Sequence, residues 1–123
     1  MSKRSGKFHI RSKIWIEDNN GKAIFGEGRL TILNAVARNG SIHAAAKELH
    51  MSYRAVWGKI KDTEERLGKP LLVRQVGGAS GGGSELTPLG EKLVEKFSEL
   101  QKHVENEVEL LFEQTFPPRN LLS

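Results

Sequence analysis

The sequence has no cysteine, which excludes disulfide bonds and thiolate chemistry. It has no apolar run near the roughly 18 residues that a membrane-spanning helix requires, and its N-terminus lacks the apolar core of a signal peptide. We therefore expect a cytoplasmic protein that makes no use of a membrane.

Catalytic and metal-binding patterns are missing as well. The 4 histidines are scattered, and His43 and His50 have no Cys, Asp or third His nearby at ligand spacing. No Ser/His/Asp set and no pair of catalytic carboxylates can be assembled. The sequence therefore predicts neither an enzyme, nor a metal site, nor a cofactor.

The charges that are present are unevenly distributed. Residues 1–90 carry 15 basic and 8 acidic side chains, whereas residues 91–113 carry 3 basic and 7 acidic ones. A positive front suits contact with a polyanion, and a negative tail suits contact with protein or solvent. At 123 residues, the chain is expected to form one domain with a modest core.

The first part of the chain is expected to be a flexible basic arm, residues 1–7, followed by a β-hairpin. Between residues 8 and 17, apolar residues occupy most even positions, an alternation that predicts a strand with one apolar face. Residues 18–21, Asp-Asn-Asn-Gly, predict a turn, and residues 22–25 a short returning strand. The apolar side of this hairpin is expected to pack on a helical core.

Three helices are predicted next, over about residues 27–39, 42–50 and 52–67. Ser41 and Ser52 stand where the N-caps of the second and third helices belong, and Gly40 and Gly68 close the pair on each side. Such a trio is the core of a helix-turn-helix domain. The positions expected to be buried are Leu30, Leu33, Val36 and Ala37 in the first helix, Ile42, Ala45, Ala46 and Leu49 in the second, and Ala55, Val56, Ile60, Thr63 and Leu67 in the third.

The third predicted helix turns an aromatic and basic surface outward, made of Tyr53, Arg54, Trp57, Gly58 and Lys61. A recognition helix carries the side chains that reach base edges at this place. Two other interpretations stay open: pairs of short amphipathic helices are common in all-α proteins, and Trp57 can instead pack under a neighbouring element.

A second hairpin is predicted after Pro70, with strands at residues 71–76 and 85–87 joined by the glycine-rich residues 77–84. The glycines are not followed by Gly-Lys-Ser/Thr and lie in no strand-turn-helix unit, so no nucleotide-binding loop is expected. We interpret the hairpin as a wing along a DNA backbone, with Arg74 supplying charge and bare amides approaching phosphates. A hairpin tip without a role is the alternative.

A long helix is predicted from Pro88 to about Phe116, because Thr87 can cap it and two prolines follow it. Part of its apolar stripe is expected to face the domain and the rest to join two chains into a homodimer; a helix folded on its own core is the alternative. The approximate heptad stripe consists of Leu93, Phe97, Leu100, Val104, Val108 and Leu111. The expected organisation is the arm at 1–7, a winged helix-turn-helix at 8–87, a dimerisation helix at 88–116 and a tail at 117–123.

These elements and their residues resemble the DNA-binding N-terminal domain of ModE-type molybdenum-responsive transcription regulators, a winged helix related to the LysR type. The similarity lies in the run GSIHAAAKELHMSYRAVWGKI, in KPLLVRQVGG before a glycine-rich tip, and in SELTPLGEKL. It implies a mostly α fold with a small β component, in which dimers form through the N-terminal hairpin and the long C-terminal helix. The residues that it places on DNA are Ser52, Tyr53, Arg54, Trp57 and Lys61 in the major groove, and Ser41, Arg74 and the glycines around Gly81 on the backbone.

Full-length members of that family carry C-terminal repeats that bind molybdate or tungstate, and this sequence stops at Ser123. We therefore expect that it does not bind these oxyanions itself, and that any metal signal arrives through a separate effector-sensing polypeptide or through the expression level. The expected partner is double-stranded DNA with an inverted-repeat operator. A protein-interaction module, using the acidic final helix and exposed aromatics without DNA as a target, stays open as the alternative.

Overall fold

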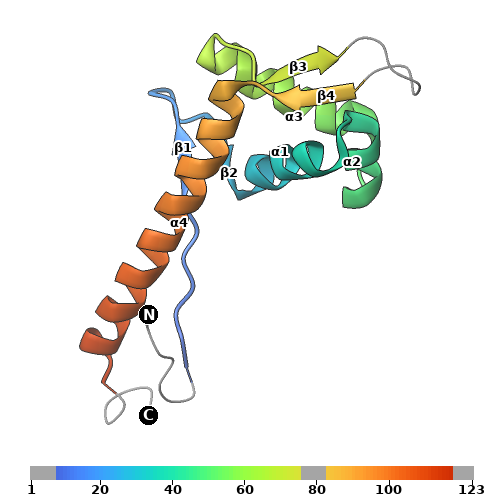
Figure 1. Ribbon diagram of the computed structural model, residues 1–123. Coiled ribbons are helices and arrows are strands. Elements are labelled where there is room, and N and C mark those ends of the chain that lie inside the picture. Colours follow the sequence, from blue (N-terminus) through green and yellow to red (C-terminus); the bar gives the residue numbers. More distant parts are fainter. Residues whose placement is uncertain (1–7, 76–82, 118–123) are drawn as a thin grey trace. The chain divides into compact units, whose positions relative to one another are not determined.

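The computed structural model describes residues 8–75 and 83–117. In chain order its elements are β1 (Trp15–Glu17), β2 (Ala23–Gly26), α1 (Glu27–Asn39), α2 (Ile42–Leu49), α3 (Tyr53–Leu67), β3 (Leu72–Gln75), β4 (Gly83–Leu86) and α4 (Pro88–Thr115) (Figure 1). The predicted mostly α fold with two small hairpins is confirmed. The predicted arm, most of the glycine-rich tip and most of the predicted tail lie outside the described residues.

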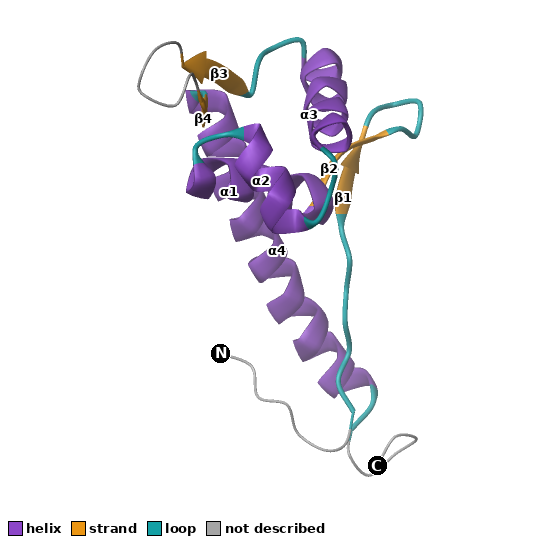
Figure 2. Cartoon of the chain, turned by 90° about the vertical axis from the view of Figure 1, so that its right-hand side faces the viewer, coloured by secondary structure: helices purple, strands orange, loops and turns teal. Residues whose placement is uncertain are grey.

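The chain divides into two compact units. One is Trp15–Phe97, and the other consists of the chain on either side of it. Within the first unit, the β1–β2 hairpin and the β3–β4 hairpin are separate two-stranded antiparallel sheets. They lie at opposite ends of the group formed by α1, α2 and α3 (Figures 1 and 2).

The first hairpin is shorter than the sequence predicts. The alternation predicts a strand over residues 8–17, but only Trp15–Glu17 form one. Its partner strand, β2, ends at Gly26 and passes directly into α1. Within the described hairpin, residues 8–14 therefore have no neighbouring strand with which to form the hydrogen bonds of a sheet. The expected packing on the core holds for Phe25 in β2, which is buried, whereas Ile16 in β1 is exposed.

The turn of this hairpin is held by the side chain of Asp18. Its Oδ1 accepts hydrogen bonds from the backbone N–H groups of Asn20 (2.8 Å) and Lys22 (3.0 Å). These bonds, that from Lys22 first, lower the pKa of Asp18 below its ordinary value of 3.8. Gly21 takes the positive φ of 83° that the predicted turn requires.

The core of the Trp15–Phe97 unit draws on all three helices. Because α1 contacts α2, α3, β2 and β4, it is enclosed on more than one side. Ile32 and Ala35 are therefore buried in addition to the predicted stripe, which describes a helix with one covered face. The predicted core positions that fall outside the buried set are Ala37 and Ala55, which are exposed, and Leu49 and Leu67, which are half-buried.

Polar contacts centred on the buried Thr63 hold α3 to α1 and β2. Thr63 is fully buried; its Oγ1 donates to the Ile24 carbonyl oxygen (2.9 Å) and accepts from Arg29 Nε (3.1 Å). Arg29 also pairs with one carboxylate oxygen of Asp62 (3.1 Å), and Arg66 pairs with the other (3.1 Å). The C-terminal half of α3 is thereby fixed against its neighbours.

The start of α4 is locked onto the segment before β3. Thr87 caps the helix by accepting a hydrogen bond from Gly90 N (3.0 Å), and its Oγ1 donates to the Pro70 carbonyl oxygen (2.9 Å). Its N–H bonds to the Leu71 carbonyl oxygen (2.9 Å). Further along, the Phe97 ring packs edge-on against Phe25, with ring centroids 5.2 Å apart.

Candidate nucleic-acid interface

The corner between α2 and α3 is set by local hydrogen bonds. The Ser41 hydroxyl accepts from Ala44 N (3.1 Å) and caps α2, while the Ser52 hydroxyl accepts from Ala55 N (3.0 Å) and caps α3. Between the helices, His50 adopts a left-handed conformation with φ of 56°. Both serines were predicted as caps and as DNA contacts; their capping is observed, and each still has a hydroxyl proton to donate.

The N-terminal half of α3 presents the predicted aromatic and basic surface. Arg54 and Trp57 are exposed, the latter by 42%. Lys61 Nζ lies 5.8 Å from the centroid of the Trp57 ring, in cation–π geometry. Tyr53 is half-buried, because its ring stacks on His43 of α2 at a centroid distance of 4.4 Å. Among residues 8–75 and 83–117, no element covers Trp57 completely, so the alternative in which it packs under a neighbouring element does not hold for that part of the chain.

The carboxylates of α3 lie in its C-terminal half, where Asp62 is held by two arginines. Glu64 is engaged as well: its Oε2 accepts from the backbone N–H groups of Leu71 (2.7 Å) and Leu72 (3.3 Å), and its Oε1 lies 3.3 Å from Lys61 Nζ. Sequence reasoning missed this link between α3 and the second hairpin. Within the part of the chain that the structure describes, Arg54 and Arg74 form no ion pair, which leaves their charges available.

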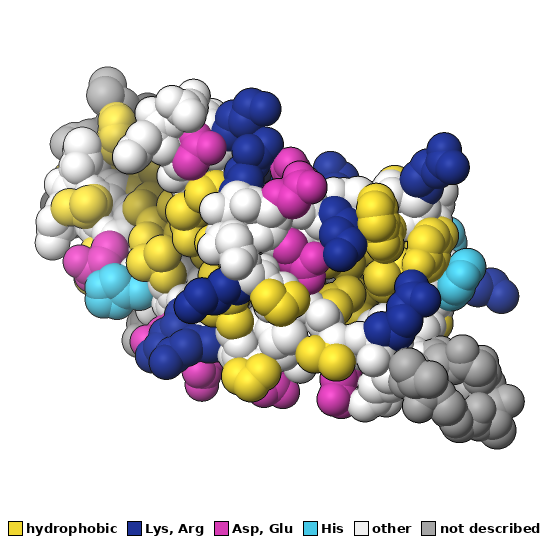
Figure 3. Space-filling model, turned by 90° about the horizontal axis from the view of Figure 1, so that it is seen from above, with side chains coloured by type: hydrophobic (Ala, Val, Ile, Leu, Met, Phe, Trp, Pro, Cys, Tyr) yellow, Lys and Arg dark blue, Asp and Glu magenta, His cyan; other side chains and the backbone are white. Residues whose placement is uncertain are grey.

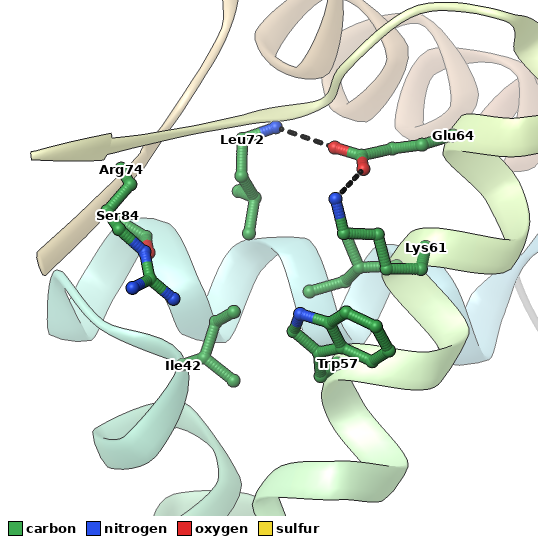
Figure 4. A pocket seen from close by; sticks show the side chains of 8 residues that line it. Ile42, Trp57, Lys61, Glu64, Leu72, Arg74 and Ser84 are labelled. Carbon is green, nitrogen blue, oxygen red and sulfur yellow. Dashed lines mark hydrogen bonds and ion pairs between the residues drawn. The ribbon is translucent and has the colours of Figure 1, made fainter.

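A pocket of about 100 Å³ brings four elements together beside Trp57. Arg74 of β3 points its guanidinium toward Ile42 of α2, and Trp57 of α3 lies on the other side of Ile42 (Figure 4). The pocket is lined by Ile42, Trp57, Ile60, Lys61, Glu64, Leu72, Arg74 and Ser84. The structure thus places Arg74 next to the predicted groove residues, although it is distant from them in sequence.

The second hairpin forms close to its predicted place. β3 and β4 pair antiparallel from Leu72↔Leu86 to Gln75↔Gly83. Gly81 lies outside the described residues, so its predicted backbone contact has no structural counterpart here. On the face seen in Figure 3, Lys and Arg side chains stand beside exposed hydrophobic side chains, with Asp and Glu side chains among them.

The predicted subunit seam on α4 is only partly exposed. Phe97 is 2% exposed and packs within its own chain against Phe25, which leaves it no surface for a second chain. Leu100 and Leu111 are exposed by 45% and 60%. The remaining members of the stripe, Leu93, Val104 and Val108, are half-buried. In the unit formed by the two ends of the chain, residues 8–14 run beside the second half of α4 (Figures 1 and 2).

The described residues include neither a membrane-spanning helix nor a metal-binding cluster. None of the helices among them is long and apolar enough to cross a bilayer. No group of three or more acidic or histidine side chains in the same ranges is placed to hold a metal ion.

Residues 28–91 match the model of a family described as bacterial regulatory helix-turn-helix protein, lysR family. Among curated proteins, the chain is 39% identical over 82 residues to the molybdenum-pterin-binding protein MopB of Rhodobacter capsulatus, covering 67% of this chain and 30% of that protein. It is 32% identical over 95 residues to the transcriptional regulator ModE of Haemophilus influenzae, covering 77% of this chain and 37% of that protein. The chain therefore spans about a third of the length of these relatives.

Among solved structures, the chain is similar to the DNA-binding domain of CbnR in a complex with DNA. The TM-score is 0.56 at 27% identity, and the match covers 72% of this chain and 95% of that domain. The match thus includes nearly all of the CbnR domain and about three quarters of the present chain.

Proposed function

The chain belongs to the lysR family of bacterial regulatory helix-turn-helix proteins, and from this premise we propose that it is a homodimeric transcription regulator that reads a specific DNA sequence with α3. The observation that carries the proposal is the exposed face of α3. Arg54 and Trp57 are exposed there, while Asp62, in the C-terminal half of α3, is paired with Arg29 of α1 and with Arg66. A helix with this charge pattern attracts the duplex with its leading half.

The proposed roles follow from position. Arg54, at the leading turn of α3, is assigned to a base edge, where a guanidinium can make a bidentate contact. Trp57 and Lys61 lie one and two turns further along and contact the groove wall. The remaining assignments are Ser52 and Tyr53 at the start of the helix, and Ser41, Arg74 and the glycines around Gly81 at the sugar-phosphate backbone.

A DNA-bound relative supports DNA as the partner. CbnR's DNA-binding domain was solved in a complex with DNA, and its match covers 72% of this chain and 95% of that domain. Residues 8–87 are accordingly proposed to form the winged helix-turn-helix, with the β3–β4 hairpin as the wing.

Dimerisation is proposed to use residues 88–116. Leu100 and Leu111 are exposed apolar residues on the heptad stripe of α4, and pairing two such helices would remove them from water. A two-fold dimer places two recognition helices on one face of the duplex, so the operator should be an inverted repeat.

The experiment that tests the proposal is repeated selection of bound duplexes from a random-sequence pool. The proposal predicts enrichment of one inverted-repeat sequence. A protein-interaction module would instead leave the pool unenriched and would show no steep dependence of DNA binding on salt. Binding to every duplex alike, with a normal salt dependence, would restrict the protein to a non-specific DNA-binding role.

A further inference from the structure

The backbone of Gly40 joins three elements. Gly40 ends α1 in a left-handed conformation, with φ of 77°, and its N–H bonds to the Val36 carbonyl oxygen (2.7 Å). The next residue, Ser41, caps α2. The carbonyl oxygen of Gly40 accepts a hydrogen bond from Ser84 N of β4 (2.8 Å). One backbone segment therefore connects the first helix, the helix-turn-helix and the second hairpin.

Gly83 is what allows the hairpin to come this close. A Cβ atom at Gly83 would lie 2.5 Å from the Gly40 carbonyl oxygen, whereas real Cβ atoms essentially never come within 3.0 Å of another heavy atom. The obstructing atom belongs to the backbone, so it cannot rotate away as the end of a long side chain can. Any side chain at position 83 must therefore push β4 away from the α1–α2 corner.

This contact lies directly across the hairpin from Arg74. In the β3–β4 register, Arg74 is opposite Ser84 and Gln75 is opposite Gly83. Arg74 and Ser84 also line the pocket that contains Trp57 (Figure 4). The place of Arg74 relative to α3 consequently depends on where β4 is attached to the corner.

We propose that Gly83 and the hydrogen bond from Ser84 N to the Gly40 carbonyl oxygen form a clip that fixes the wing relative to the recognition helix before DNA is bound. The inference rests on the proposed function. A wing that is already in place loses less conformational freedom on binding than a free one. The contact of Arg74 with the DNA backbone and the contacts of α3 with the major groove are then made together. Gly83 acts as a positioning residue for Arg74.

The test compares Gly83→Ala with Gly28→Ala in the full chain. Gly28 is the matched control, because a Cβ atom added there meets nothing within 4 Å. Affinity for a random-sequence duplex pool is measured against salt concentration for wild type, both variants, Arg74→Ala and the Gly83→Ala/Arg74→Ala double variant. A pool of random duplexes is sufficient for this measurement, because contacts with the DNA backbone do not depend on the base sequence.

The clip predicts that Gly83→Ala and Arg74→Ala each reduce the salt slope by about one. This changes the ratio of the affinity at about 50 mM salt to that at about 200 mM salt by roughly fourfold. The double variant should bind no more weakly than Arg74→Ala alone, because both changes remove the same contact. Gly28→Ala should bind like the wild type. Wild-type binding by Gly83→Ala, or a loss that adds fully to that of Arg74→Ala, would overturn the proposal.

Hydrogen exchange provides a second readout that needs no DNA. The Ser84 amide should be protected in the wild type and exchange faster in Gly83→Ala, while amides in α1 and α3 keep their protection. If Gly83→Ala does not fold, Ser84→Pro removes the donor itself and should give the same DNA-binding result. A freely exchanging Ser84 amide in the wild type contradicts the clip alone, whereas a wild type that binds no DNA overturns both the clip's role and the proposed function.

Discussion

Arg54 and Arg74 carry the same charge but are proposed to contact different parts of the duplex. Arg54 lies at the leading turn of α3, and Arg74 lies in β3. Arg54→Ala is expected to cost about 1–3 kcal/mol on the selected duplex and less on random duplexes, because a base contact is lost. Arg74→Ala should weaken binding to both kinds of duplex nearly equally and reduce the salt slope by about one.

Fluorescence anisotropy titrations on selected and random duplexes, repeated at several salt concentrations, measure both effects. Lys22→Ala is the control, because it removes one positive charge from the turn of the hairpin at the other end of the three-helix group. If Arg54→Ala weakens both duplexes equally, Arg54 contacts phosphate and the base assignment is wrong.

Glu48 ties α2 to the end of α1. Its hydrogen bonds from the Arg38 guanidinium and then from the Asn39 amide lower the pKa of Glu48 below its ordinary value of 4.5. Because folding lowers this pKa, the carboxylate stabilises the fold above about pH 4.5 and ceases to do so as the pH falls through the lower folded-state value. The group is exposed, so a small effect is expected.

Glu48→Gln should therefore shrink the fall in Tm between about pH 6 and about pH 3, since the variant has no carboxylate to protonate. Thermal unfolding followed by circular dichroism measures the difference. Glu65→Gln, which changes an exposed carboxylate of α3, is the control. An identical fall in Tm for wild type and Glu48→Gln would contradict the assigned role.

Residue roles were predictable where the chemistry is local. Ser41 and Ser52 each accept a bond from a backbone N–H three residues ahead, a spacing that the sequence displays directly. Thr63 is bonded to residues 34 and 39 positions away, so its sequence position indicated burial but not its polar partners. The same limit hid Glu64 as the link to β3.

At the scale of elements, Glu64 joins α3 to the second hairpin through two backbone amides. Glu64→Ala is expected to destabilise the protein by about 1–3 kcal/mol, because it leaves the amide of buried Leu71 without an acceptor. Chemical denaturation measures the free energy of unfolding. Glu65→Ala should change it by less than about 0.5 kcal/mol, as an exposed neighbour outside this contact. Equal effects of the two changes would show that the Glu64 bonds contribute little.

The elements themselves were predicted with uneven success. The four helices carry capping residues and stop signals next to their ends in the sequence. The predicted ends of the helices were therefore close to the observed ones. The prediction of a strand from residue 8 was wrong. Alternation of apolar and polar residues indicates an extended chain but not the length of the partner strand, and β2 ends at Gly26. The place of Arg74 beside Trp57 required the tertiary attachment of the hairpin, which no local pattern encodes.

At the scale of the whole molecule, the proposed dimer depends on α4. Leu100→Glu and Val104→Glu should place charge in the subunit seam and convert dimers into monomers that keep their helical circular dichroism. Sedimentation at micromolar concentration measures the mass. Lys102→Glu, a charge change on an exposed position of the same helix, should leave the dimer intact. Unchanged mass in both seam variants would contradict dimerisation through α4.

Sequence reading by α3 is tested most directly by the ratio of the Kd for a permuted duplex to the Kd for the selected duplex, measured at physiological salt. Specific binding proteins discriminate by about 10³-fold or more. We predict a ratio of at least that order for an inverted-repeat duplex bound by two chains, and a much smaller ratio for Arg54→Ala. A ratio near one for the wild type, with tight binding to both duplexes, would contradict the claim.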